Sequence, residues 1–510
     1  MKKIIATFLI ITLFFTVGSC SYDDLDKTNP NQLVVDTYYQ NESELNSGLY
    51  AIYGTMAGAN LFSRSYWFFN DIRSDEVSSG GGQLTAEFNQ ILNGTHDASN
   101  PVNASIWKGL YQVIHRANIV INKAPEAMEV DESIREKIIA EARCARGWAY
   151  YELGTIWGKA PVYLTYVTNF SETNPVSSQQ EVLDQAVEDL TAAAAVLDFS
   201  GSKKGRMSKG SALALLGRVY MFTGDYTKAK EALDEIVTSG NYALVDEYDD
   251  NFQEENEYNS ESIWEIGFAK IGAYNWADTG DGTGNEASIH SQEYSAYGWR
   301  NIIPSQKMLD EFERPENGAE KRDPRLDKNL YFVGDTFNNG TEVIESGNIK
   351  GSALKYNGGE MKISWRKHSA MYKVNPAGYY ESGINHRVIR YAEVLLNLAE
   401  CELEAGDQNK SVEYLNMIRQ RTSVNMPPYP TSKYPTGTKD EVFAAIMHEK
   451  MVELADEQVR NRDLLRWRAQ GKLKEEPLEY YSPRHQFMPI PQQEIDNNAN
   501  ITENDQNSGY

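Results

Sequence analysis

The sequence predicts a mainly α-helical protein, built on an interrupted scaffold of tetratricopeptide-type helix pairs with long loop-rich insertions. Two observations support this fold class. Three segments share one spacing of small and aromatic residues, and the stretches between them show neither helical nor alternating periodicity. Helix pairs of this kind cannot bury their apolar faces alone, so we expect them to stack despite the insertions that separate them.

The N-terminus has the pattern of an export signal. Lys2 and Lys3 precede an apolar run over residues 4–17, and Gly18 and Ser19 are small residues suited to a cleavage site. This order of basic, apolar and small residues is typical of a secretory signal peptide. The apolar run is shorter than the ~20 residues that a membrane-spanning helix needs, so a retained anchor is the weaker interpretation.

Cys20 stands at the boundary between the signal and an acidic stretch. The residues VGSC at 17–20 resemble the bacterial lipobox, in which the cysteine is acylated and becomes the mature N-terminus. The alternative is an ordinary signal peptide followed by a chance cysteine. Asp23 and Asp24 resemble the acidic tag that sends some lipoproteins to the outer face of the outer membrane. We therefore expect residues 1–19 to be removed and Cys20 to be a lipid tether, held by ~0.8 kcal/mol for each buried methylene.

Composition limits the partners. The 510 residues carry a net charge of −24, which argues against nucleic acid and against charge-driven binding to anionic lipid. Length alone suggests two or three domains, and no second apolar run is long enough to cross a bilayer. Cys144 and Cys401 lie in helical patterns and are expected to be buried thiols. The 31 tyrosines exceed the 17 phenylalanines, which favours rings with one wet edge, as at binding surfaces.

The helix pairs follow in chain order. The clearest spans residues 211–237, where a small residue stands at the expected helix contact, an aromatic follows one turn later, and a Gly-Asp-Tyr turn comes next. These positions are Gly217, Tyr220, Gly224, Tyr226 and Ala229. Gly147, Tyr150 and Gly154 keep the same offsets in the first pair, whose second helix follows an insertion over residues 161–175. We predict units near residues 137–197, 208–238 and 391–420.

The insertions differ from the helices in composition. Residues 61–103 and 271–300 are rich in Tyr, Trp, Asn, Asp and Gly, and both are expected to be loops. Residues 338–359 and 426–438 have Gly/Asn-rich and Pro/Tyr-rich loop compositions. Long loops on a rigid scaffold are where binding usually resides.

Motifs of catalysis are missing from the sequence. It has no phosphate loop, serine-hydrolase elbow or dinucleotide fingerprint. HEKMV at His448 begins like a zinc-protease helix, but Val452 replaces the second histidine. DTGDGTGN from Asp278 lacks the alternating oxygen ligands of an EF-hand. We therefore expect a binding protein rather than an enzyme, with no cofactor and no metal site.

At this point the chain, from Cys20 to Tyr510, resembles the SusD/RagB family of outer-membrane nutrient-binding lipoproteins. The motifs that carry the resemblance are CSYDDLD, IHRANIVINKAP, EARCARGWAYYELGTIWGKAPVY, GRMSKGSALALLGRVYMFTGDY, RDPRL, RYAEVLLNLAECELEAGD, VELADEQVRNRDLLRW and PIPQQEIDNNANI. The departures are Glu449-Lys450 for the usual Glu-Arg, Asp456 where an aromatic is common, Ala499 for a proline, and Asn507-Ser508-Gly509-Tyr510 for Asn-Pro-Gly-Tyr. They lie in scaffold motifs, so none bears directly on a ligand.

The resemblance implies one domain over residues 20–510, with the helix pairs packed against a loop-rich half that carries the ligand site. It implies a non-enzymatic protein at the cell surface that captures oligosaccharides, or in some members peptides, for a partner TonB-dependent transporter of the SusC type. A hydrolase, or a pure scaffold built on the repeats, is the alternative from another class.

Sugar capture indicates which loop residues to consider. Trp and Tyr rings stack on the apolar face of a pyranose, and Arg, Asn and Asp bind its hydroxyl rim. The predicted ligand-binding residues are Tyr66, Trp67, Arg73, Asp75, Asn93, Trp276, Tyr294 and Tyr297. Trp67 has a core alternative and Asp75 a structural one, whereas Trp276 lies in a polar loop and is the strongest single candidate. Trp299 is interpreted as structural.

Overall fold

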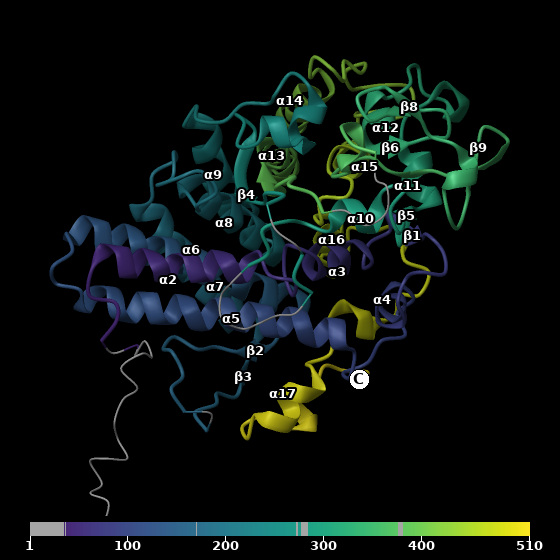
Figure 1. Ribbon diagram of the computed structural model, residues 1–510. Coiled ribbons are helices and arrows are strands. Elements are labelled where there is room, and N and C mark those ends of the chain that lie inside the picture. The colour runs from purple at the N-terminus through teal and green to yellow at the C-terminus, as the bar shows by residue number, and fades with distance from the viewer. Residues whose placement is uncertain (1–34, 36, 170, 272–273, 277–283, 376–380) are drawn as a thin grey trace, which may run out of the picture.

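Long helices make up one side of the molecule. The computed structural model describes residues 35, 37–169, 171–271, 274–276, 284–375 and 381–510. The helices of ten or more residues are α2 (Glu42–Met56), α5 (Pro101–Lys123), α6 (Glu132–Ile156), α7 (Gln179–Val196), α8 (Lys209–Thr223), α9 (Tyr226–Thr238), α13 (Tyr391–Ala405), α14 (Gln408–Arg419), α15 (Lys439–Glu453) and α16 (Arg460–Ala469). Figure 1 shows α2 and α5–α9, in purple to teal, gathered on the left of the molecule.

The three predicted helix pairs are present. Helix α6 packs against α7, α8 against α9, and α13 against α14. A Cβ on Gly147 would lie 2.8 Å from Leu190 Cγ, and one on Gly217 would lie 2.6 Å from Leu233 Cδ2. Glycine at these positions therefore lets the paired helices approach, which confirms the interpretation of the spacing.

The turn between α8 and α9 is equally local in origin. Gly224 ends α8 with a left-handed φ of 82°, a conformation that glycine adopts without steric cost. Asp225 then caps α9, because its Oδ1 accepts a hydrogen bond of 3.1 Å from the Lys228 amide. Gly406 and Asp407 do the same between α13 and α14.

The remaining elements are short. The short helices are α3 (Ser65–Asp71), α4 (Ala86–Leu92), α10 (His290–Tyr294), α11 (Gln306–Glu311), α12 (Pro324–Asn329) and α17 (Gln492–Asn497). The strands are β1 (Val77–Ser79), β2 (Ala160–Pro161), β3 (Val176–Ser177), β4 (Ser262–Ile266), β5 (Ile302–Pro304), β6 (Leu330–Tyr331), β7 (Thr336–Phe337), β8 (Glu342–Val343), β9 (Leu354–Tyr356), β10 (Gly359–Met361), β11 (Ser364–Trp365) and β12 (His386–Arg390). In the described part of the chain they form only two-stranded antiparallel sheets.

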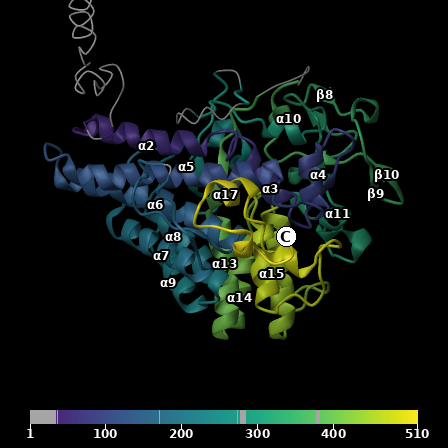
Figure 2. The same ribbon diagram turned by 90° about the horizontal axis from the view of Figure 1, so that it is seen from below.

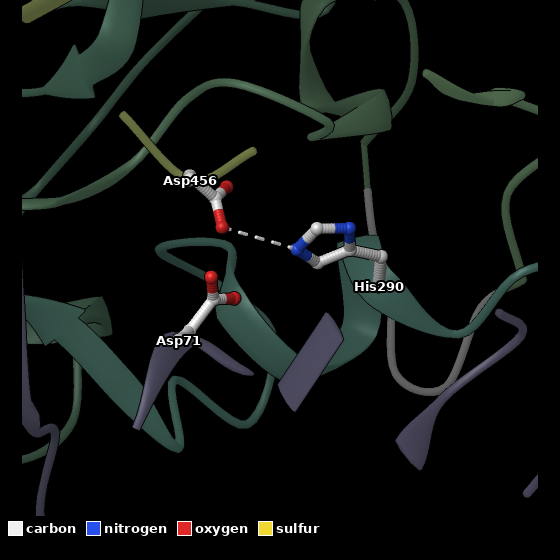
Figure 3. Close-up of side chains that lie close together, drawn as sticks. All are labelled: Asp71, His290 and Asp456. Atoms are coloured by element: carbon white, nitrogen blue, oxygen red, sulfur yellow. Dashed lines mark ion pairs between the residues drawn. The ribbon is translucent and has the colours of Figure 1, made fainter. Parts of the chain in front are cut away.

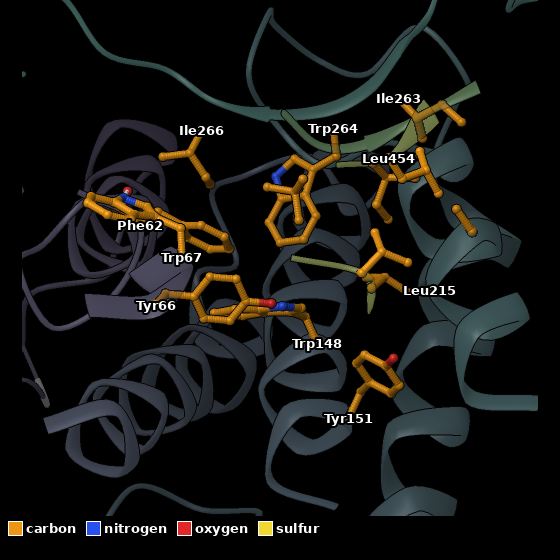
Figure 4. Close-up of a cluster of buried hydrophobic side chains, with 14 of the residues drawn as sticks. Phe62, Tyr66, Trp67, Trp148, Tyr151, Leu215, Ile263, Trp264, Ile266 and Leu454 are labelled. Atoms are coloured by element: carbon orange, nitrogen blue, oxygen red, sulfur yellow. Dashed lines mark hydrogen bonds between the residues drawn. The ribbon is translucent and has the colours of Figure 1, made fainter. Parts of the chain in front are cut away.

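The long helices and the short elements meet at an aromatic core (Figure 4). Trp148 of α6 stacks on Phe62 at 5.2 Å between ring centroids and meets Trp264 of β4 edge-on at 5.8 Å. The three rings are buried. Burial of large aromatic side chains is the main apolar contribution at such a junction. This core joins α6 to β4 and to the segment before α3.

The C-terminal segment returns to the start of α5. Asn103 of α5 donates a hydrogen bond of 2.8 Å to the Pro489 carbonyl, and Trp107 donates one of 3.2 Å to Glu494 of α17. Figure 2 shows this yellow segment crossing the face that holds α5. Of the described helices, none combines the length and the apolar character that a membrane crossing requires. The signal segment and Cys20 lie outside the described residues.

Two sequence predictions need correction here. Residues 61–103 are not one loop, because α3, α4 and the first residues of α5 lie within them, and α10 lies within residues 271–300. Long-range burial rather than helical periodicity stabilises these short helices, so sequence periodicity does not reveal them. The expectation for the cysteines is confirmed, since Cys144 and Cys401 are free thiols buried in helices.

Candidate functional site

An exposed aromatic surface lies between β4 and α10. We call it the Trp276 surface and define it by Arg64, Tyr274, Asn275, Trp276 and Trp299. Trp276 is 48% exposed, although most large apolar side chains of the described residues are buried. Its ring stacks on that of Trp299, with centroids 5.9 Å apart and planes 29° from parallel. Two neighbouring indoles at a surface offer flat faces of the kind that stack on a sugar ring.

The Arg64 guanidinium packs on the Trp276 ring. The Arg64 guanidinium carbon lies 5.3 Å from the centroid of Trp276 and 5.1 Å from that of Phe88. Arg64 Nε also donates a hydrogen bond of 2.7 Å to Glu293 of α10, which is buried. A guanidinium over an indole face contributes ~0.5–1 kcal/mol at exposed sites. Arg64 therefore supports the Trp276 ring and ties it to α10 through Glu293.

Polar contacts fix the backbone that carries Trp276. The Asn275 amide donates a hydrogen bond of 2.7 Å to Asn285 Oδ1, and Asn285 Nδ2 donates one of 2.9 Å to Ser63 Oγ. Tyr274 Oη and Ser63 Oγ lie 3.2 Å apart in a further hydrogen bond. The segment is thus anchored to the residues before α3, which holds Trp276 outward without burying it.

The structure separates the eight predicted residues. Trp276 and Asn93 are exposed, and Tyr297 is partly buried, with its hydroxyl accepting a hydrogen bond of 2.9 Å from the Glu345 amide. The other five are buried: Tyr66, Trp67, Arg73, Asp75 and Tyr294. For these five, the expectation of an open loop position is corrected. Tyr66 and Trp67 are buried side chains of α3, and Tyr294 is a buried side chain of α10. Arg73 and Asp75 follow α3 and are buried as well.

The buried residues have structural partners. Tyr66 Oη donates to Glu152 at 2.9 Å, and Tyr294 Oη donates to Asp71 at 2.9 Å. Trp67 is fully buried and stacks on His290 with centroids 4.1 Å apart. The core alternative for Trp67 is therefore the one that the structure supports.

Asp75 belongs to an ion pair. Its carboxylate accepts hydrogen bonds from Arg460 at 2.8 and 3.0 Å and from Lys307 at 2.5 Å. Burial alone would raise the pKa of Asp75, but these two cations hold it well below its ordinary value. Asp75 and Asn93 both line a cavity of about 460 Å³. Trp276 does not line this cavity. The structural alternative for Asp75 is supported.

Four residues of the Trp276 surface are absent from the predicted ligand-binding set: Arg64, Tyr274, Asn275 and Trp299. The sequence interpretation of Trp299 is structural, and the structure shows it partly buried and stacked on Trp276. The signal for Trp299 was its position in the same Tyr/Trp-rich segment as Trp276. The Asp278 motif spans residues 278–285, of which 278–283 lie outside the described residues.

Comparison with known proteins identifies the family. A family model described as "SusD family" matches residues 260–485, one described as "Starch-binding associating with outer membrane" matches residues 23–221, and a tetratricopeptide-repeat model matches residues 210–239. SusD-like protein P25 of Formosa agariphila is 26% identical over 539 residues, which cover 98% of this chain and 99% of that protein.

Solved structures share the fold. A SusD superfamily protein from Bacteroides vulgatus superposes with a TM-score of 0.76 at 24% identity, covering 93% of this chain and 100% of that one. A laminarin-binding SusD-like protein superposes with a TM-score of 0.72 at 26% identity, covering 92% and 100%. With two family models spanning most of its length and a relative matched from end to end, the chain belongs to the SusD/RagB family.

Proposed function

We propose that this protein is a surface-exposed outer-membrane lipoprotein that binds oligosaccharides and delivers them to a partner TonB-dependent transporter of the SusC type. One observation carries the proposal: the half-exposed ring of Trp276, braced by Trp299 and Arg64. A pyranose presents an apolar face to such rings, and stacking contributes ~0.5–1.5 kcal/mol beyond area burial. Family membership and a laminarin-binding structural neighbour support the ligand class.

The test of the ligand site is Trp276→Ala. The full chain in detergent is screened against a glycan array that includes laminarin fragments, and the affinity for the best ligand is measured by calorimetry. Truncating a binding anchor costs ~2 kcal/mol or more, so we expect a loss of affinity of about tenfold or more. Because the ring is half exposed, the free energy of unfolding should fall by less than the ~3–5 kcal/mol typical of a core tryptophan.

Tyr50→Ala is the matched control. Tyr50 is 49% exposed, lies on α2 and is not part of the Trp276 surface, so its loss should leave affinity unchanged. Equal affinities of Trp276→Ala and the parent chain would contradict the site. If the chain binds peptides but no glycan, the ligand class is peptides and not oligosaccharides. Shortening of the bound oligosaccharide by the purified chain would contradict a purely binding role.

The tether is tested separately. If Cys20 carries the lipid, Cys20→Ala should move the protein from the outer-membrane fraction to the soluble fraction or stall its processing. Cell fractionation followed by immunoblotting measures this outcome. A correctly processed alanine variant that stays fully in the outer membrane would contradict lipid anchoring, because an unmodified chain has no acyl methylenes to bury.

A further inference from the structure

Three side chains from distant parts of the chain converge in the interior (Figure 3). Asp71 ends α3, His290 begins α10, and Asp456 follows α15. One ligand atom of each, two carboxylate oxygens and an imidazole nitrogen, all lie within 4.8 Å of one another. The three residues are 0–4% exposed. Two carboxylates and one imidazole in a buried cluster match the charge and the donor atoms that a divalent cation requires.

The cluster contains buried polar atoms that hydrogen bonding does not satisfy. With both carboxyl groups ionised, His290 Nε2, the two Asp456 oxygens and Gln458 Oε1 have no hydrogen-bond partner within the described residues. The Asp71 and Asp456 carboxyl groups are close enough to share a proton, which is the alternative to a shared cation. A buried polar group without a partner costs about 1–3 kcal/mol, and more when charged. Such groups are rare in native interiors and call for a physical explanation. A shared cation would give His290 Nε2 and an Asp456 oxygen a partner at once.

The distance between His290 and Asp456 suits two ligands of one metal ion better than it suits a hydrogen bond. His290 Nε2 and Asp456 Oδ1 are 3.5 Å apart, within ion-pair distance but long for a hydrogen bond. Two ligands of one tetrahedral ion with bonds of about 2.1 Å lie about 3.4 Å apart. Lys367, a cation whose charge acts on Asp456, donates instead to the Ala455 carbonyl and to Glu457, both at 2.7 Å.

The surroundings orient the proposed ligands. Tyr294 Oη donates to Asp71 Oδ2 at 2.9 Å, and Gln458 Nε2 donates to Asp71 Oδ1 at 3.0 Å. The His290 ring is clamped between Trp67, at 4.1 Å, and His368, at 4.7 Å between centroids. Hydrogen bonds to ligating carboxylates and a fixed imidazole plane are the usual support of a metal site.

We propose that Asp71, His290 and Asp456 form a structural site for a divalent transition-metal ion, with zinc as the best fit and Gln458 Oε1 as the fourth ligand. Calcium prefers six to eight oxygen ligands and magnesium keeps several waters, neither of which suits a buried site containing imidazole. The ion would join α3, α10 and the segment between α15 and α16. Because α10 also carries Glu293, which holds Arg64, the ion would stiffen the support of the Trp276 surface.

Metal stoichiometry tests the proposal. The full chain in detergent is stripped of metal with a chelator and then dialysed separately against Zn²⁺, Mn²⁺ or Ca²⁺. Excess Mg²⁺ and salt in the dialysis displace surface-bound ions. Elemental mass spectrometry then measures the metal retained per chain. We expect about one Zn²⁺ retained per chain, and a melting temperature raised by about 2 °C or more. Co²⁺ should give the intense visible absorption of a four-coordinate site.

Asp456→Asn and His290→Gln should each lose the bound Zn²⁺ and the cobalt absorption, because each substitution removes one ligand. Both substitutions keep the side-chain volume nearly unchanged, so they test the ligand rather than the packing. His96→Gln is the matched control: His96 is also buried, but it contacts Tyr510 rather than the cluster, so the variant should retain the ion.

Three outcomes would overturn the assignment. The first is no Zn²⁺ or Mn²⁺ retained by the parent chain. The second is Ca²⁺ retained by both the parent and His290→Gln, which would make the site an oxygen-ligand calcium site. The third is an unchanged metal content with a more stable Asp456→Asn, which would indicate two carboxyl groups sharing a proton. The parent measurement stands even if a variant fails to fold.

Discussion

At the scale of single residues, His448 shows how a motif that resembles chemistry serves the fold. His448 lies in α15, where its Nδ1 is 2.7 Å from Glu311 Oε1 and its Nε2 is 3.4 Å from Glu313 Oε2. Burial would lower the pKa of His448, but the hydrogen bonds to these carboxylates raise it from 6.5 to about 9. The same contacts overcome burial and lower the pKa of Glu311 from 4.5 to about 2. The histidine is therefore a buried cation in an ion pair.

This pair predicts a pH dependence of stability. A raised histidine pKa contributes stability that is complete below pH 6.5 and is lost as pH rises through about 9. The lowered Glu311 pKa contributes stability that is complete above pH 4.5 and is lost as pH falls through about 2. At about 1.4 kcal/mol for each pKa unit, the histidine contribution is roughly 3 kcal/mol. The stability difference between the parent chain and His448→Gln should thus shrink by roughly 2–3 kcal/mol between pH 6.5 and pH 9.

Urea denaturation at several pH values measures this difference. His96→Gln is the control, because burial lowers the pKa of His96 to about 3 and the group is neutral across the whole window. Its difference from the parent should stay constant. A constant difference for His448→Gln as well would show that His448 is not a cation in the fold.

At the scale of elements, the contact between α8 and α9 depends on one missing side chain. Gly217 faces Leu233, which is fully buried, and a Cβ there would meet Leu233 at 2.6 Å. Interiors are packed at the density of organic crystals, so added volume forces backbone shifts. The glycine thus sets the separation of the two helices.

Gly217→Leu should destabilise the protein by about 1–3 kcal/mol through overpacking. Leu233→Ala alone should cost about 2–5 kcal/mol through the cavity it leaves. The double variant should cost clearly less than the sum, because the new leucine occupies the vacated volume. Denaturation of all four chains completes the cycle, and strict additivity would mean that the two positions do not share a contact.

At the scale of the whole molecule, a buried ion network joins α12, α15, β12 and the segment after α14. Glu453, at the end of α15, accepts hydrogen bonds from Arg390 of β12 at 2.8 Å, from Arg421 after α14 at 2.7 Å, and from Arg325 of α12 at 3.0 Å. All four side chains are almost fully buried. Burial would raise the pKa of Glu453, but the three guanidinium groups hold it well below its ordinary value.

Removing that one charge should therefore destabilise the whole fold. Glu453→Gln leaves buried arginines without full compensation, and breaking a buried pair in this way costs about 3–5 kcal/mol. The comparison is Asp440→Asn, which breaks an exposed pair with Lys474 and should cost about 0–1 kcal/mol. Calorimetric melting of both variants tests the contrast. Equal melting temperatures of the two variants would show that the network does not hold these elements together.

Local chemistry made part of this structure predictable. The helix pairs follow from spacings such as Gly217 to Leu233 and from the Gly224-Asp225 turn, because helix contacts and caps depend on residues a few positions apart. The thiols at Cys144 and Cys401 were predictable for the same reason. Trp276 was identified as an exposed ring from its polar neighbours alone, and its role in binding stays a prediction.

The choice among the remaining aromatic and acidic residues was made by tertiary structure. Residues 66–69 have the composition of a binding loop, but contacts with distant segments fold them into α3 and bury them. Trp299 became part of the Trp276 surface only when β4 and α10 placed the two rings together. Asp71, His290 and Asp456 belong to no common motif, since 385 positions separate the first from the last (456 − 71). Sequence patterns encode local geometry, whereas burial and convergence depend on which distant segments share a core.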